Sequence, residues 1–503
     1  MTIATERELD DDLFNRTTLF IGGRWVEPGG DNRLDIVNPA TEKVIGSVPE
    51  ASEADVDRAI EAAVDAFKNS PWRRLSYAER ARYLERLAEE IEARADRVAQ
   101  AYVHDFGGTI RSGQVMAAGA AALVRAHVGY VDRLSDDPER VTVGNLEALL
   151  VREPIGPVLG IVPWNTTFYV SVVKMAPALL TGCPIVIKVA TESPLGSFVL
   201  AEAIEAAGIP EGQVSFLPGR REALGAITKR PEFHYISFTG STAAGIEIMK
   251  DAAENVTALT LELGGKSGGI ILDDLDPVEH APLVFAGTMA QAGQICTTYS
   301  RLFVPKAKEA AWRKALAEYY DGLVVGDPSD PATDVGPLVS ASHRDKVERY
   351  IEIARSEGAT VIAGGGRPAD LAQGYFVRPT LVADVTSDMR IVREEVFGPV
   401  ITLQSYETED DAIAMANDSE YGLAGGIFTL SEERAIPIAL RLEAGNISVN
   451  LSSGSFQLPF GGYKKSGIGR EGGFAGVEEL LEWKQVQLKR TPAIDIPRDA
   501  ARN

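Results

Sequence analysis

The feature that most constrains this chain is the stretch from Pro154 to Gly265, where apolar runs typical of strands alternate with helical segments. Val158 to Val162 and Pro184 to Val189 are two such runs, and the spacing of apolar residues between and after them predicts helices. Continuous apolar strands separated by helices indicate a parallel sheet covered by helices on both faces. Such sheets bind their ligands at the carboxyl ends of the strands.

A second alternating block of similar length runs from Leu302 to Asn450 and predicts a second α/β domain. Two further segments, Leu146–Glu153 and Leu480–Leu488, are extended in pattern but have no neighbouring strand in the sequence. They predict an arm that adds strands to another element or to another subunit.

Charge and composition exclude several classes of protein. Lys and Arg number 50 against 72 Asp and Glu, which gives a formal net charge of −22. Because that field repels nucleic acid and anionic lipid, we expect neither a nucleic acid nor a membrane as partner. No apolar run reaches the length of a bilayer span, and the N-terminus lacks the apolar core of a signal peptide, so the expected compartment is the cytoplasm.

The two cysteines stand in different surroundings. Cys296 lies in the small and polar segment Gln291–Thr298, where a thiol could be reachable and reactive. Cys183 precedes Pro184 at the start of an apolar strand and is predicted to be an inert core residue. A buried, inert role is equally open to Cys296. A cysteine hydrolase would need a histidine partner, yet none of the five scattered histidines lies in these segments, and none forms a metal-binding pair.

Two polar residues end predicted strands at what should be one edge of the sheet. Glu262 closes an otherwise apolar strand, where burial would raise its pKa toward the range of a general base. A structural ion pair with Lys266 is the alternative. Asn165, in the segment Pro163–Asn165, could stabilise an oxyanion or could simply cap a turn.

Three more segments stand out. Phe238–Gly245 is a glycine-containing turn between a strand and a helix, where backbone N–H groups could hold a phosphate. Glu394–Pro399 places two acids and an aromatic before a Gly-Pro break and could equally be a solvated loop. Pro459–Glu471 combines glycines with basic residues. Each segment is weak evidence when taken alone.

Taken together, the segments resemble the aldehyde dehydrogenase superfamily, in the non-acylating branch that hydrolyses its thioester. The motifs are PWN at 163–165, FTGSTxxG at 238–245, LELGGK at 261–266, GQxC at 293–296, EEVFGP at 394–399 and PFGGYKKSGIGRE at 459–471. They occur in the expected order, the similarity runs from about residue 19 to 487, and the set is specific.

The resemblance implies an aldehyde dehydrogenase-like α/β fold with three parts. A Rossmann-like cofactor domain would take residues 14–131 and 154–264, and a second α/β catalytic domain residues 265–476. A β-strand oligomerisation arm would take residues 132–153 and 477–503, with a homodimer or homotetramer as the assembly.

The resemblance also assigns roles, with an aldehyde as substrate and NAD or NADP as cofactor. The implied catalytic residues are Cys296 as nucleophile, Asn165 in the oxyanion hole, Glu262 as base and Lys174 in a proton relay with Glu262. The cofactor residues are Ile161, Trp164, Lys188, Thr191, Arg221, Gly240, Ser241, Gly245, Leu263, Glu395 and Phe397. The aldehyde tunnel would be lined by Thr166, Tyr169, Val170, Val173, Ile295, Thr297 and Phe456. No metal is implied.

This chain departs from the family pattern at three positions. Thr191 stands where NAD-specific relatives carry a glutamate that repels a 2′-phosphate, and Lys188, Arg220 and Arg221 could attract one, so we expect tolerance of NADP. Arg221 also replaces a glycine. Tyr299 follows the nucleophile where a small residue is usual.

The tunnel set is wide, mostly apolar and free of surplus arginine. It therefore predicts an uncharged aldehyde, aromatic or medium-chain aliphatic. The alternatives are a semialdehyde-specific enzyme, a coenzyme A-acylating enzyme, and a catalytically silent member of the family. Glu262 argues against the acylating branch, whose members commonly lack that base.

Overall fold

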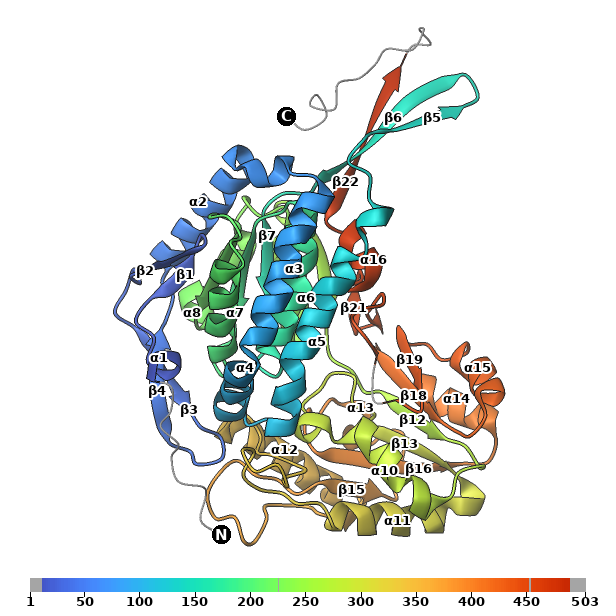
Figure 1. Ribbon diagram of the computed structural model, residues 1–503. Coiled ribbons are helices and arrows are strands. Elements are labelled where there is room, and N and C mark those ends of the chain that lie inside the picture. The colour runs from blue at the N-terminus through green and yellow to red at the C-terminus, as the bar shows by residue number, and fades with distance from the viewer. Residues whose placement is uncertain (1–10, 225, 452–453, 489–503) are drawn as a thin grey trace.

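A computed structural model of the chain describes residues 11–224, 226–451 and 454–488. Two large β-sheets with helices against them make the body of the molecule, and a narrow three-stranded sheet projects from it (Figure 1). The predicted α/β fold with largely parallel sheets is confirmed.

The first large sheet has the strand order β21-β11-β10-β7-β8-β9. Its strands are β7 (Val158–Ile161), β8 (Ile185–Val189), β9 (Val214–Pro218), β10 (Tyr235–Thr239), β11 (Ala258–Glu262) and β21 (Gly467–Ile468). The first five are parallel, as their continuous apolar runs predict, and β21 pairs antiparallel with β11. Strand order reverses beside β7, so a ligand crevice is expected at the carboxyl edge there.

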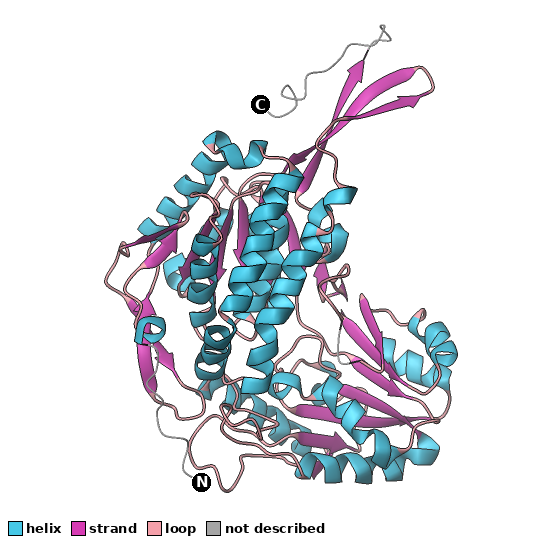
Figure 2. Cartoon of the chain, in the orientation of Figure 1, coloured by secondary structure: helices cyan, strands magenta, loops and turns pink. Residues whose placement is uncertain are grey.

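Helices cover both faces of this sheet (Figure 2). α6 and α7 pack on one face with α3, α5 and α16 outside them, while α2 and α9 pack on the other. The helices of this part are α1 (Asp11–Phe14), α2 (Glu53–Asn69), α3 (Tyr77–Ala93), α4 (Ala95–Ala101), α5 (Ile110–Val128), α6 (Thr167–Thr181), α7 (Leu195–Ala206), α8 (Arg221–Leu224), α9 (Thr242–Ala253) and α16 (Gly473–Glu478). α6 is apolar on nearly every side because it is sandwiched between the sheet and the outer helices.

Two antiparallel hairpins flank this body. β1 (Leu19–Ile21) pairs with β2 (Arg24–Val26), and β3 (Arg33–Val37) pairs with β4 (Val44–Pro49). The Gly22-Gly23 turn of the first hairpin has positive φ angles at both residues, a conformation that favours glycine.

Polar side chains and prolines mark the boundaries of several helices. Ser52 and Asp55 form a reciprocal capping box at the start of α2. Pro194 occupies the N-cap of α7, and the hydroxyl of the preceding Ser193 donates to the Trp164 carbonyl. α8 ends at Leu224, and a short 3₁₀ turn follows at Ile227–Lys229.

The second large sheet has the order β14-β15-β16-β13-β12-β18-β19 and is parallel except at β14. Its strands are β12 (Gly268–Ile271), β13 (Arg301–Pro305), β14 (Thr360–Ala363), β15 (Thr380–Ala383), β16 (Val400–Tyr406), β18 (Ala424–Phe428) and β19 (Asn446–Val449). Its helices are α10 (Pro277–Thr288), α11 (Glu309–Asp321), α12 (Ala341–Ser356), α13 (Arg390–Arg393), α14 (Glu409–Asn417) and α15 (Glu432–Ala439). A small bridge of β17 (Tyr421–Gly422) and β20 (Tyr463–Lys464) lies nearby.

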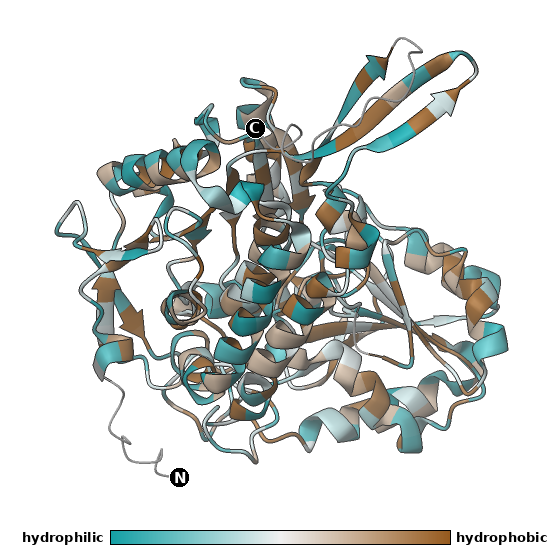
Figure 3. Ribbon diagram, turned by 45° about the horizontal axis from the view of Figure 1, so that its top comes forward, coloured by the Kyte–Doolittle hydropathy of each residue, from teal (hydrophilic) through white to brown (hydrophobic). Residues whose placement is uncertain are grey.

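The projecting sheet contains β5 (Glu139–Val143), β6 (Leu146–Pro154) and β22 (Leu481–Leu488) in the order β22-β6-β5. The two extended segments predicted to lack a partner thus pair with each other, a contact that their distance in sequence conceals. Hydrophobic and hydrophilic residues are interspersed along these strands (Figure 3), and Val143, Trp483 and Val486 are exposed. Residues 489–503 of the predicted arm lie outside the described part of the chain.

The predicted domain bounds stay a prediction. β21 joins the first sheet although residues 467–468 fall within the range predicted for the second domain.

Candidate active site

One cavity of about 610 Å³ gathers most of the predicted site residues. It opens at the carboxyl ends of β7, β10 and β11, where the first sheet faces the loop before β13. Its lining consists of Pro163, Trp164, Asn165, Thr166, Tyr169, Val170, Thr239, Gly240, Ser241, Glu262, Leu263, Gly264, Ile295, Cys296, Thr297, His343, Lys346, Glu395, Phe397, Gly454, Ser455, Phe456 and Phe460.

Cys296 follows a tight 3₁₀ turn at Ala290–Gly293 that ends α10. Gln291 and Ala292 in this turn have φ angles of +54° and +56°, a backbone conformation that residues other than glycine rarely adopt. The chain after the turn runs against Gly265, where a Cβ would lie only 2.4 Å from the Cys296 carbonyl oxygen. Burial, together with the nearby Glu395 and Glu262 carboxylates, raises the pKa of the Cys296 thiol to about 12.

Asn165 stands directly after β7 and is almost fully buried. Its Nδ2 donates to the Gln294 carbonyl at 2.7 Å, so the amide contacts the loop that carries Cys296. The Gln294 side chain is fixed in turn, because its Oε1 accepts from the Val339 backbone N–H and its Nε2 donates to the Gln291 carbonyl. This long-range contact replaces the turn-capping role considered for Asn165.

Glu262 closes β11 with only 3% of its surface exposed. Among the described residues, neither carboxylate oxygen has a hydrogen-bond partner. The alternative of an ion pair with Lys266 is wrong, since the buried Lys266 ammonium also lacks a described partner and lines a different, smaller cavity. Burial raises the pKa of Glu262 well above its usual value, and the charge of Glu471 adds to the rise.

Lys174, on α6, lies behind the cavity wall rather than in it. Its Nζ donates to Ser237 Oγ at 2.8 Å, Thr239 Oγ1 at 2.9 Å and Glu471 Oε1 at 2.6 Å. No hydrogen bond joins Lys174 to Glu262, so direct contact in the predicted relay is not observed. Its positive charge nevertheless lowers the pKa of Glu262, opposing the effect of burial.

Glu395 and Gly264 of the LELGGK segment line another part of the cavity. The Glu395 Oε1 atom accepts from the Gly265 backbone N–H at 2.9 Å. A Cβ at Gly264 would lie 2.5 Å from Glu395 Oε2, so this approach requires glycine. Burial raises the pKa of Glu395.

The start of α9 borders the same part of the cavity. Ser241 is its N-cap, accepting from the Ala244 backbone N–H at 3.3 Å. Gly245 lies in the first turn, outside the cavity lining, and packs so closely on Leu263 that a Cβ would lie 2.5 Å from that side chain.

The aldehyde side of the cavity is aromatic. The Phe456 and Phe460 ring centroids are 4.1 Å apart, and Tyr169 lies 6.0 Å from Phe456. Val173, predicted in the tunnel, lies outside the cavity lining and packs in the core, one helical turn beyond Tyr169 and Val170 on the same side of α6.

The remaining predicted cofactor residues also lie outside the lining. Ile161 packs beside the core at the end of β7, and Lys188 lies near the end of β8, where burial lowers its pKa. Thr191 Oγ1 donates to Glu192 Oε2 at 3.2 Å, and Arg221 is exposed at the start of α8.

Arg220 and Arg221 are the two arginines that were expected to attract a 2′-phosphate. The Arg220 guanidinium is already paired with Glu50 at 2.6 Å. Both arginines are exposed, but within the described residues only Arg220 forms an ion pair, so Arg221 is the better placed of the two.

Tyr299, the unusual residue after the nucleophile, is fully buried and donates through its hydroxyl to the Leu451 carbonyl at 3.2 Å. Glycines make room for its ring, since a Cβ at Gly287 or Gly426 would lie 2.5 to 2.6 Å from it.

Sequence reasoning missed several lining residues. Pro163, Thr239, Gly264 and Phe460 belong to the recognised motifs, and their place in those motifs could have indicated them. His343 and Lys346 stand at the start of α12, in a segment with no motif. Gly454 and Ser455 likewise carried no signal.

Comparison with known proteins gives the same picture for the whole chain. Residues 25–486 match the model of the aldehyde dehydrogenase family. The chain belongs to the aldehyde dehydrogenase family. Among similar proteins is a geranial dehydrogenase of Castellaniella defragrans, 38% identical and aligned over 93% of this chain and 98% of the relative.

Solved aldehyde dehydrogenases have the same fold as this one. A betaine aldehyde dehydrogenase of Staphylococcus aureus in complex with NAD+ is 36% identical, covers 95% of both chains and superposes with a TM-score of 0.91. A Mycobacterium tuberculosis aldehyde dehydrogenase complexed with NAD+ is 40% identical, covers 94% of this chain and 99% of its own, and gives a TM-score of 0.91. The predicted membership of the family is therefore confirmed.

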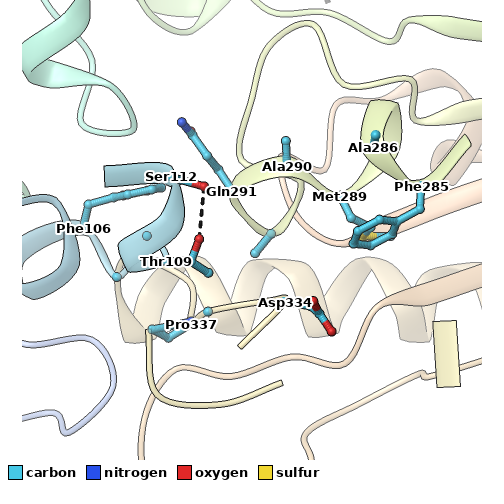
Figure 4. Close-up of a pocket in the computed structure, with 14 residues that line it drawn as sticks. Phe106, Thr109, Ser112, Phe285, Ala286, Met289, Ala290, Gln291, Asp334 and Pro337 are labelled. Carbon is cyan, nitrogen blue, oxygen red and sulfur yellow. Dashed lines mark hydrogen bonds between the residues drawn. The ribbon is translucent and has the colours of Figure 1, made fainter. Parts of the chain in front are cut away.

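This aldehyde dehydrogenase has a second, smaller cavity of about 200 Å³, which is lined in part by the turn that precedes Cys296 (Figure 4). Phe285, Met289 and the left-handed Gln291 line it together with Thr109 and Ser112, whose hydroxyls are hydrogen-bonded at 3.0 Å. No predicted site residue lines this cavity.

Within residues 11–224, 226–451 and 454–488, no helix is both long and apolar enough to cross a membrane. The same residues contain no group of three or more His, Cys, Asp or Glu side chains arranged to hold a metal ion.

Proposed function

We propose that this aldehyde dehydrogenase oxidises an uncharged small-molecule aldehyde to the carboxylic acid with NAD(P)+, through a thioester on Cys296. One observation carries the proposal. Cys296, Glu262 and Asn165 come from three separate segments and line one cavity, in which Glu395 and Phe397 stand opposite an aromatic cluster.

Cys296 supplies the nucleophile in this scheme. The thiol releases its proton to solvent water, and the sulfur forms a bond to the aldehyde carbon while the carbonyl electrons move to oxygen. The Asn165 amide and the Cys296 backbone N–H donate to that oxyanion. The contact of the Asn165 amide with the Gln294 carbonyl supports this role, because it holds the amide at the nucleophile loop.

The far end of the cavity fits a nicotinamide dinucleotide. The N-terminal end of α9 suits a pyrophosphate, and the absence of a side chain at Gly264 leaves the Glu395 carboxylate able to accept from ribose hydroxyls. When bound, the dinucleotide accepts the hydride that leaves the carbon attached to Cys296. We assign the remaining cofactor contacts to Ile161, Trp164, Lys188, Thr191, Arg221, Gly240, Ser241, Gly245, Leu263 and Phe397.

Glu262 acts as the general base for the second half of the reaction. It takes a proton from a water molecule that attacks the thioester carbonyl, and the C–S bond breaks to give the carboxylic acid and the free thiol. The lack of any described hydrogen-bond partner leaves both of its oxygens available for that water. Lys174, held by Glu471, supports the ionised form of Glu262 through its charge.

The cofactor preference follows from what surrounds Thr191. Threonine carries no charge to repel a 2′-phosphate, and the exposed Arg221 adds attraction. The neighbouring Glu192 accepts a hydrogen bond from Thr191 and supplies the opposing charge. We propose that the enzyme accepts both NAD+ and NADP+.

The substrate is proposed to be aromatic or medium-chain aliphatic. Tyr169, Phe456 and Phe460 offer ring faces, and no arginine lines the cavity to pair with a substrate carboxylate. The relatives act on different aldehydes, since one is named for geranial and another for the cationic betaine aldehyde. The aromatic cluster could hold either through ring contacts, so charge on the aldehyde is the property to test.

A homodimer or homotetramer is proposed as the assembly. The arm formed by β5, β6 and β22 projects from the body and exposes Val143, Trp483 and Val486. A projecting sheet that exposes apolar side chains and an unpaired strand edge is suited to pairing with another copy of the chain.

An aldehyde panel run separately with NAD+ and NADP+ tests the proposal. Benzaldehyde, hexanal, succinic semialdehyde and betaine aldehyde are compared by kcat/KM from the absorbance of the reduced cofactor. We expect the first two to lead. A lead by succinic semialdehyde or betaine aldehyde contradicts the uncharged substrate, and acyl-coenzyme A as the product contradicts hydrolysis by Glu262.

A further inference from the structure

His343 is a cavity residue for which the reaction scheme above has no use. It lies in the first turn of α12, where its backbone N–H donates to the N-cap hydroxyl of Ser340 at 3.2 Å. The helix cap therefore fixes the backbone from which the ring projects.

The ring makes one short hydrogen bond. His343 Nε2 lies 2.7 Å from the Phe397 carbonyl oxygen, and because a carbonyl can only accept, the proton must be on Nε2. Burial lowers the pKa of His343 to about 4, so the ring is neutral at physiological pH. A neutral ring with its proton on Nε2 is a fixed donor.

The acceptor belongs to a strained residue. Phe397 has a φ angle of +63°, a left-handed conformation that costs energy for any residue with a side chain. It is preceded by Glu395, whose carboxylate is held by the Gly265 backbone N–H. The hydrogen bond from His343 thus holds the one residue of this turn whose backbone is under strain.

The rings around the turn form a mutual cluster. The His343 and Trp164 ring centroids are 5.2 Å apart, those of Trp164 and Phe397 are 5.3 Å apart, and those of His343 and Phe397 are 6.1 Å apart. The three residues come from the loop after β7, from α12 and from the segment before β16. His343 therefore links α12 to both walls of the cofactor end.

We infer that His343 is a positioning residue, which holds the Phe397 turn in its left-handed conformation and so fixes the Phe397 ring and the Glu395 carboxylate for the cofactor. The inference rests on the proposed placement of the nicotinamide half beside these two residues. His343 itself performs no proton transfer. Its loss should weaken cofactor binding and leave the thiol and the aldehyde side unchanged.

Three variants separate this role from a general structural one. His343→Leu removes the donor and keeps much of the volume, whereas His343→Gln retains an N–H donor on a side chain of similar reach. His280→Leu is the matched control, because His280 on α10 also lies against a backbone carbonyl, that of Asp276 at 3.0 Å, but is remote from the cavity lining.

The dissociation constant for NAD+ is measured by calorimetry, together with the KM values for NAD+ and aldehyde and the rate of Cys296 alkylation. For His343→Leu we expect the dissociation constant and the KM for NAD+ to rise about tenfold, the size of one lost hydrogen bond. The aldehyde KM and the alkylation rate should stay within about twofold of wild type, the range expected when that bond is not involved. His343→Gln should recover most of the binding, and His280→Leu should match wild type.

Unchanged NAD+ binding in His343→Leu overturns the inference, as does an equal rise in the aldehyde KM or a failure of His343→Gln to recover. If His343→Leu does not fold, His343→Asn replaces it, because its amide is too short to reach the carbonyl. A wild-type enzyme that reduces neither NAD+ nor NADP+ with any aldehyde contradicts the proposed function instead, so the two failures are distinguishable.

Discussion

The two ends of the large cavity are built in different ways. At the cofactor and nucleophile end, Asn165 and Glu395 are each held by a hydrogen bond from a segment far away in sequence. At the aldehyde end, Tyr169, Phe456 and Phe460 meet only through ring contacts. Hydrogen bonds demand a defined geometry, whereas apolar contacts tolerate exchange at constant volume. We therefore expect substitutions at the first end to abolish the chemistry and those at the second to retune it.

The largest effect is expected from Cys296→Ala. Without the sulfur no covalent intermediate can form, so kcat should fall by about 10⁴-fold or more. The value of kcat is measured from the rate of NAD(P)+ reduction with the best aldehyde of the panel.

Cys183→Ala is the matched control for this variant. Cys183 is a thiol in the core, and burial raises its pKa. It should be dispensable for turnover. Activity retained in Cys296→Ala but lost in Cys183→Ala would reverse the assignment of the nucleophile.

Glu262→Gln is expected to come next. The amide cannot accept a proton from water, so acyl transfer to water should slow by about 10²- to 10⁴-fold. Formation of the thioester does not need that proton transfer, so the variant should show a burst of reduced cofactor and an acyl adduct on Cys296 by mass spectrometry. Turnover at the wild-type rate without adduct would show that another group activates the water.

The sequence motifs predicted the residues that line the cofactor and nucleophile end of the cavity. Cys296, Glu262, Asn165, Glu395 and Phe397 all lie in motif segments, and all of them line the cavity. Such motifs record what the chemistry and the close backbone approaches require, such as glycine at position 264 beside the Glu395 carboxylate. A parallel sheet was also predictable, because strands buried on both faces must be apolar throughout.

The contacts that support the site were not predictable in the same way. His343 and Lys346 are ordinary helix residues in the sequence, and only the packing of α12 on the Phe397 turn brings them to the cavity. Val173 was assigned to the tunnel, but α6 is apolar and buried along nearly its whole length, so its sequence pattern does not reveal how far along the helix the cavity extends. The pairing of β6 with β22 depends on segments at opposite ends of the chain.

The pH dependence of the thiol tests the electrostatics of the first end. Because the pKa of Cys296 is raised to about 12, the thiolate is the minor form at neutral pH and its fraction grows as pH rises. The rate of alkylation by iodoacetamide should therefore increase about tenfold per pH unit from about pH 7 to about pH 10. A flat profile would show that the thiol is already ionised at neutral pH.

Glu395→Gln sharpens that test. The Glu395 charge is one cause of the raised pKa of Cys296, so removing it should speed alkylation at a fixed pH by about three- to tenfold. Glu394→Gln is the control, since Glu394 forms an exposed ion pair with Arg390 and should leave the rate unchanged. Equal rates in the two variants would exclude a specific effect of Glu395.

The smallest effect is expected at the aldehyde end, from Phe456→Leu. Leucine keeps an apolar surface but removes the ring that contacts Phe460 and Tyr169, a loss of about 0.5–1.5 kcal/mol of aromatic contact. The kcat/KM for benzaldehyde should fall by about three- to tenfold relative to that for hexanal, which needs apolar contact but no ring face. The burst of reduced cofactor and the alkylation of Cys296 should be unchanged, because no hydrogen bond of the described residues joins Cys296 or Glu262 to this ring cluster. If Phe456→Leu slowed both aldehydes equally, or slowed alkylation, the two ends would be coupled, and the aromatic cluster would be supporting the nucleophile loop as well as selecting the substrate.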